Sequence, residues 1–231
     1  MPVERDPVET PAPPAGPVGR HAGLAVAVGL ACLAAAAVLA APLLPFQDLP
    51  AHAAILRILS DPERYAPWFV PAPPWVHSSL AYLLGRALAV PLGADGAVRA
   101  MVALAVGGLP LAAWAAGRAT TGRGGPAAVA GFAGAFGQSV GMGFLPWTLA
   151  ASFAPAGLAG VAWAMRRRST AAAVALAGVG SVVAFGLHFF GYLLFAFLVA
   201  TYAVRTARGR LRLLVPVAAV LPGALLFAAG R

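Results

Sequence analysis

Apolar residues occur along this chain in long runs that are interrupted by short polar segments. The first run, Gly23 to Leu44, contains no charged residue and as a helix is long enough to cross about 30 Å of hydrocarbon. Further apolar segments cover residues 75–92, 98–117, 126–140, 144–165, 171–186, 189–204 and 211–230. The pattern predicts an all-α fold, a polytopic bundle of transmembrane helices.

The composition favours an integral membrane protein over a soluble domain. Hydrophobic residues make up 61% of the chain and charged residues only 10%. The 16 basic residues are all arginine, and they form short clusters between apolar segments instead of one basic face. This distribution argues against nucleic acid as a partner and makes the lipid bilayer the expected one. Arginine without lysine, with abundant alanine and glycine, is typical of a GC-rich bacterial genome, so we expect a bacterial plasma (inner) membrane.

The chain divides into a tail and one transmembrane domain. Residues 1–20 are rich in proline and of mixed charge, with too few apolar groups to offset the entropy of ordering, so we expect a disordered cytoplasmic tail. Residues 21–231 are the expected transmembrane domain. Within it, residues 45–96 are interpreted as an outer loop with juxtamembrane helices.

The arginine clusters set the expected topology. They lie near residues 118–123, 166–168 and 205–212, and two apolar segments separate each from the next. The clusters therefore share one side of the membrane, which the positive-inside rule makes cytoplasmic.

The segment over residues 75–92 decides on which side the first polar loop lies. It contains His77, Arg86 and Pro91, and an arginine near mid-bilayer costs about 2.5–3.5 kcal/mol. We therefore interpret this segment as a juxtamembrane or re-entrant helix that does not cross. About seven spans result, with the N-terminus in the cytoplasm and the first loop outside.

Carboxylates are confined to a small part of the chain. Outside the tail, the acidic residues are Asp48, Asp61, Glu63 and Asp95, and none occurs from residue 96 to residue 231. Chemistry that needs a carboxylate base, nucleophile or metal ligand must therefore use the outer loop or Asp95.

Asp48 and His52 are the candidate catalytic residues. Asp48 precedes Pro50 at the start of a short surface helix expected over residues 50–59, where its carboxylate could cap free backbone N–H groups. His52 lies four residues later on the same helical face, a spacing that lets a carboxylate orient an imidazole. Capping and catalysis are compatible, because a general base requires a fixed position.

Five further residues are candidates for substrate binding. Arg57 and Arg86 could form bidentate bonds to a phosphate, although Arg57 could instead lie among lipid headgroups. Asp61 and Glu63 could bind a divalent metal through hard oxygen ligands or belong to an ordinary solvated turn. His188 separates two short apolar segments, where an ionisable residue marks a functional site or merely tolerates the interface.

Several stretches resemble the N-terminal portion of the GT-C superfamily of integral-membrane glycosyltransferases. They are Phe46-Gln47-Asp48-Leu49-Pro50-Ala51-His52, Pro73-Pro74-Trp75, residues 93–99, and the turns at residues 141–146 and 187–191. The resemblance implies an extracytoplasmic site that uses a sugar linked to polyprenyl phosphate. An acidic residue, which Asp48 matches, would act as base or metal ligand while an acceptor attacks the anomeric carbon. The family often has a paired D-x-D or E-x-D where this loop has a lone Asp48, so metal dependence and the identity of any cofactor stay open.

Two other functions are kept beside this hypothesis. Ser139 and His188 together resemble the dyad of a rhomboid-type intramembrane serine protease, although Val140 stands where those enzymes have glycine. A non-catalytic structural or transport subunit would explain the many small residues, which tight helix packing requires.

Overall fold

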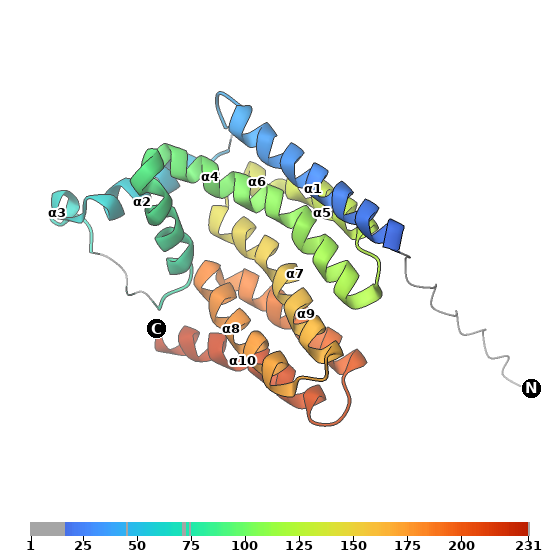
Figure 1. The fold of residues 1–231 in the computed structure, drawn as a ribbon. Helices are drawn as coiled ribbons and strands as arrows, with labels where there is room; N and C mark the ends of the chain where they lie inside the picture. Colours follow the sequence, from blue (N-terminus) through green and yellow to red (C-terminus); the bar gives the residue numbers. More distant parts are fainter. Residues whose placement is uncertain (1–16, 45, 71–72, 74, 231) are drawn as a thin grey trace, which may run out of the picture.

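The computed structural model describes residues 17–44, 46–70, 73 and 75–230, and this part of the chain is built from helices (Figure 1). In chain order they are α1 (Pro17–Ala40), α2 (Leu49–Ser60), α3 (Pro62–Tyr65), α4 (Ser79–Thr121), α5 (Gly125–Ala135), α6 (Gln138–Gly141), α7 (Leu145–Arg166), α8 (Thr170–Leu187), α9 (Phe189–Thr206) and α10 (Leu211–Ala229).

Six of the described helices are long and apolar enough to cross a membrane, namely α1, α4, α7, α8, α9 and α10. Large apolar side chains such as Leu33, Val179 and Phe197 are more than half exposed on their surfaces. Such a surface is stable in hydrocarbon and would promote aggregation in water. The expected fold class, an all-α multi-pass bundle, is confirmed.

The apolar segment over residues 126–140 is not one continuous helix. α5 ends at Ala135, and α6 covers only Gln138–Gly141. Between them Gly137 has extended backbone angles (φ −68°, ψ 177°). The 11 residues of α5 span about 16 Å, roughly half of the hydrocarbon thickness.

The bundle has two chemically different ends. The basic end consists of the start of α1 and the connections α4–α5, α7–α8 and α9–α10, and it carries the three arginine clusters (Figure 1). There Arg166 donates to the backbone carbonyl of Arg118 at 3.5 Å. The carboxylate end consists of residues 41–44 and 46–48, α2, α3, residues 137–144, His188 and the end of α10.

α4 is a helical hairpin, bent at Gly93. This glycine has φ 70° and ψ 170°, a conformation that is essentially restricted to glycine. The arms, residues 79–92 and 94–121, fold back on each other (Figure 1). A Cβ placed on Gly85 in the first arm would lie 2.8 Å from the sulfur of Met101 in the second. Leu56 of α2 fills the space beside both arms and is 1% exposed.

Both ends of the first arm lie at the carboxylate end of the bundle. Near its start, the His77 ring is 6.3 Å from the His188 ring, and Leu80 packs on Gly186 at the end of α8. Just beyond the bend, Asp95 pairs with Arg57 of α2. The second arm has about 28 residues and spans about 42 Å, whereas the 18-residue α8 and α9 span about 27 Å. The first arm contacts the shorter helices at the turn between them, through Leu80 and the preceding His77.

Arg99 joins α1 to α4 close to this bend. Its guanidinium donates to the carbonyls of Val38 at 3.0 Å and Pro42 at 3.2 Å, and also to that of Ala41. A cation that binds the last carbonyls of a helix satisfies their hydrogen bonds and stabilises the helix dipole. Arg99 thus holds the backbone at the start of the polar loop that follows α1.

Candidate functional site

The backbone of Asp48 is held by the turn between α6 and α7. The Asp48 N–H donates to the Met142 carbonyl at 3.2 Å, and the Gln47 N–H donates to the Gly141 carbonyl at 3.4 Å. Gly143 closes this turn with φ 81°, and a Cβ there would lie 2.7 Å from the Asp48 nitrogen. Only glycine combines this backbone angle with so close an approach.

The carboxylate of Asp48 is half-buried and makes no hydrogen bond within the described residues. Asp48 occupies the position before α2, but its side chain caps none of the helix N–H groups. The capping alternative is therefore not realised. The backbone of Asp48 is held in place, and its carboxylate keeps its capacity to accept hydrogen bonds.

His52 connects three segments of the chain. Its Nε2 lies 3.0 Å from the Gly143 carbonyl, which can only accept, so Nε2 carries the hydrogen. Its Nδ1 then accepts from the Tyr82 hydroxyl at 2.8 Å. Burial lowers the pKa of His52, while the Gly143 hydrogen bond and the charge of Asp48 act weakly in the opposite direction. The imidazole is consequently held neutral, with both nitrogens engaged.

The structure thus brings Asp48 and His52 together, with Tyr82 rather than Asp48 as the hydrogen-bonding partner of the imidazole. Asp48 acts on His52 through its charge. Since neither ring nitrogen of His52 is free, the histidine is suited to fixing α2 against the Gly143 turn. Asp48 is left as the group available for proton transfer.

An apolar groove of about 450 Å³ extends from Tyr82 between α2 and the first arm of α4. A volume of this size is typical of small-molecule sites. Its walls are mostly apolar side chains of α2 and of the arm, together with Phe69, Val70, Pro73 and Val76. Its polar groups include Arg86 and His77. Of the predicted substrate-binding residues, Arg86 lines this groove.

Arg57, Asp61 and Glu63 do not line this groove. Arg57 is paired with Asp95 at 2.6 Å, and both side chains are more than half exposed, so the pair contributes at most about 1 kcal/mol. Asp61 caps α3 by accepting the Arg64 N–H at 3.4 Å. Glu63 is exposed in the first turn of α3.

The described residues contain no cluster of side chains that could bind a metal. No group of three or more histidine, cysteine or carboxylate side chains there could hold a metal ion. Asp48 and the exposed Asp61 and Glu63 do not converge.

His188 belongs to a ring cluster at the α8–α9 turn. Its Nδ1 accepts the Phe190 N–H at 3.2 Å, which caps α9. Its ring lies 6.0 Å from that of Trp147 and 6.3 Å from that of His77. Burial lowers the pKa of His188, and the nearby His77 lowers it further. The cluster ties residues 75–78 to the bundle.

Ser139 and His188 are not joined in the arrangement that a serine protease requires. The Ser139 hydroxyl accepts the indole N–H of Trp147 at 2.9 Å. In the described part of the chain no hydrogen bond links it to His188, whose Nδ1 is already occupied. A nucleophilic serine needs a direct hydrogen bond to its base.

Sequence reasoning missed the roles of Tyr82 and Gly143. Nothing in the sequence near Tyr82 shows that its hydroxyl meets a histidine 30 residues away. The close pair Gly141 and Gly143 was a usable signal, since a glycine-rich turn often permits close backbone contact.

A scan against protein-family models and searches of curated proteins and of solved structures found no match to this chain.

Proposed function

We propose that the protein is a membrane glycosyltransferase of GT-C type, which transfers a sugar from a polyprenyl-phosphate carrier to an acceptor outside the cytoplasm. The observation that carries the proposal is the carboxylate of Asp48, which is half-buried, positioned through its backbone and without a hydrogen-bonding partner in the described residues. A base for an acceptor hydroxyl needs these properties.

In this proposal the acceptor hydroxyl transfers its proton to Asp48 while its oxygen forms a bond to the anomeric carbon. The bond from that carbon to the carrier phosphate breaks, and the phosphate leaves with the bonding electrons. His52, neutral and bonded to Tyr82 and Gly143, keeps α2 in register with the Asp48 turn. Arg86 supplies a guanidinium for the phosphate charge.

The groove beside Tyr82 supports a lipid-linked substrate. Its apolar walls suit an isoprenoid chain, and Arg86 lies in the same lining. A purely structural subunit would need no groove of about 450 Å³ whose lining residue Tyr82 is connected through His52 to the turn that holds Asp48.

The test is a transfer assay in membranes that contain the full chain, with a panel of radiolabelled polyprenyl-phosphate sugars. Asp48→Asn should lower the rate by about 10²–10⁴-fold, the usual contribution of a general base. Glu63→Gln is the matched control, because Glu63 is an exposed carboxylate of the same loop, and it should keep the rate. Full activity of Asp48→Asn at unchanged expression would refute the proposal.

A further inference from the structure

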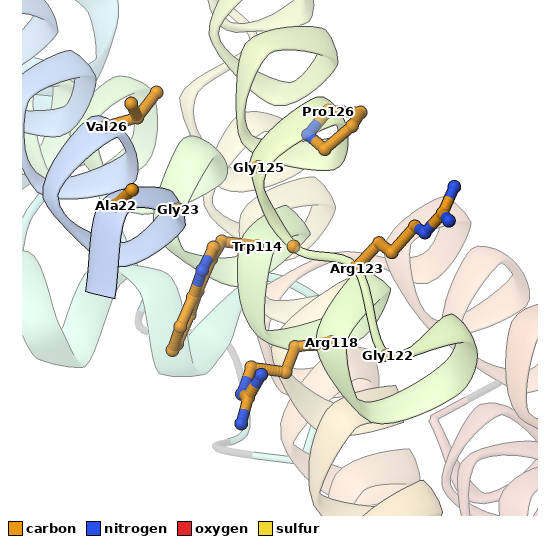
Figure 2. Close-up of a pocket in the computed structure, with 10 residues that line it drawn as sticks. Ala22, Gly23, Val26, Trp114, Arg118, Gly122, Arg123, Gly125 and Pro126 are labelled. Atoms are coloured by element: carbon orange, nitrogen blue, oxygen red, sulfur yellow. The ribbon is translucent and has the colours of Figure 1, made fainter. Parts of the chain in front are cut away.

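A second cavity, of about 400 Å³, lies at the basic end of the bundle (Figure 2), whereas Asp48 lies at the carboxylate end. It is bounded by the start of α1, the last turns of α4 and the α4–α5 connection. Trp114 stands between α1 and this connection (Figure 2), and its indole packs against the backbone of Gly124. The proposed transfer reaction makes no use of this cavity.

The two arginines that line the cavity have no acidic partner within the described residues. Arg118 is half-buried and Arg123 is exposed, and neither guanidinium has a hydrogen bond or ion pair within the described residues. In Figure 2 the two side chains extend from separate sides of the α4–α5 connection. Arg166 donates to the Arg118 carbonyl, which places a third guanidinium beside the Arg118 backbone.

The bundle cannot supply an anion for these arginines. No acidic residue occurs from residue 96 to residue 231, and the acidic residues that the structure describes all lie at the carboxylate end or beside the α4 bend. Unpaired guanidinium groups at the rim of a cavity raise the local concentration of anions, and their forked donors match the oxygens of a phosphate.

The same cavity also has an apolar wall. Val26, Trp114 and Pro126 line it, and exposed apolar side chains such as Leu33 and Val129 continue along α1 and α5. An indole at the end of a membrane-spanning helix is typical of the headgroup level of a bilayer. A ligand that fits both parts has an anionic head and a hydrocarbon chain.

We propose that this cavity binds one anionic phospholipid, with its phosphate at Arg118, an acyl chain along α1 and α5, and the charge of Arg123 attracting the headgroup from the other side of the α4–α5 connection. Basic pockets between transmembrane helices have the chemistry to hold such headgroups. The lipid would stabilise the junction of α1, α4 and α5, independently of any transfer activity.

The first test titrates the detergent-solubilised full chain with short-chain phosphatidylglycerol and, separately, phosphatidylcholine, and counts bound lipids by native mass spectrometry. Phosphatidylglycerol should bind about tenfold more tightly, and Arg118→Gln with Arg123→Gln should abolish this preference. Arg208→Gln with Arg210→Gln is the control, because it removes the same charge from the α9–α10 connection. Equal binding of both lipids, or an equal loss in the control, would overturn the proposal.

The second test uses the unaltered protein, so its result does not depend on whether a variant folds. Phosphatidylglycerol with a photoreactive diazirine high in its acyl chain is crosslinked to the unaltered protein. Adducts should map to residues 22–33 or 114–129, and adducts confined to other segments would contradict the site.

Two competing occupants are distinguished in the same experiment. Millimolar inorganic phosphate should leave the crosslink in place, and its displacement would assign the site to a free anion. The substitutions Glu4→Gln, Asp6→Asn and Glu9→Gln remove the carboxylates of the N-terminal tail. If the lipid crosslinked only to the protein that carries these three substitutions, the tail carboxylates rather than a lipid would occupy the cavity in the unaltered protein.

Discussion

At the scale of single residues, the site depends on contacts between backbone and side chain around Asp48. Gly143 approaches the Asp48 nitrogen with a positive φ, and its carbonyl accepts from His52. Tyr82 completes the network from α4. Each member positions the next, so the free carboxylate of Asp48 is located by neighbours that carry no charge.

Gly143→Ala should destabilise the protein by about 1–3 kcal/mol, since alanine at this φ is strained and its Cβ would meet the Asp48 backbone. Thermal unfolding in detergent measures the loss. Gly141→Ala is the control, because a Cβ there meets nothing within 4 Å. Equal midpoints for the two variants would show that the turn does not need glycine at position 143.

His52 should make the stability depend on pH. Burial lowers the pKa of His52 in the folded chain, so between the folded and unfolded pKa values the unfolded chain binds more protons. The free energy of unfolding therefore falls as the pH drops below about 6.5. Unfolding midpoints measured between pH 7.5 and pH 5 should decline in the unaltered protein.

In His52→Gln the pH slope should be shallower, although the variant is less stable at every pH because it loses contacts to Tyr82 and Gly143. His188→Gln should change the slope in the same direction, since burial also lowers the pKa of His188. Slopes identical to that of the unaltered protein in both variants would disprove the effect.

At the scale of elements, the bend of α4 controls where the groove forms. The first arm returns along the second, α2 packs on both through Leu56, and the groove opens between α2 and the first arm. A straight α4 would carry Tyr82 away from His52. The bend thus connects a local backbone angle to the assembly of the site.

Gly93→Ala should lower the free energy of unfolding by about 1–3 kcal/mol, because φ 70° with ψ 170° is a region that alanine avoids. The loss is one of backbone strain, since a Cβ at this position would meet no atom within 4 Å. Gly29→Ala in α1, equally free of contacts, should keep or raise the stability. Denaturation of both variants in detergent makes the comparison, and an unchanged Gly93→Ala would contradict it.

At the scale of the whole molecule, the two ends of the bundle differ in charge and in structure. The arginine clusters gather at one end, and Asp48, His52 and His188 lie at the other. A multi-pass protein with this asymmetry presents two chemically different surfaces to the two sides of a membrane. The proposed transfer site and the proposed lipid site are then on opposite sides.

Single cysteines should reveal this arrangement. In a Cys32→Ala background, Glu63→Cys in α3 and Arg208→Cys in the α9–α10 connection should react with a membrane-impermeant maleimide from opposite sides, with Glu63→Cys outside the cytoplasm. Both positions are exposed. Labelling of both from one side would remove the basis for an extracytoplasmic site.

The fold class follows from sequence, because the hydropathy of a run of residues is a local property. The bounds and bends of the individual helices were harder to predict from the sequence. A straight hydrophobic segment over residues 126–140 is compatible with its composition, yet Gly137 divides it. The bend at Gly93 likewise depends on where α2 and the α8–α9 turn pack, which no window of sequence contains.

The candidate site divides in the same way. The sequence by itself determined which side chains could supply a carboxylate or an imidazole, because a chain with so few acidic residues leaves few choices. Tertiary structure alone decided their partners. His52 meets residues 30 and 91 positions away, and Arg57 pairs with a residue 38 positions away. Such contacts depend on how helices pack, and packing is a property of the whole bundle.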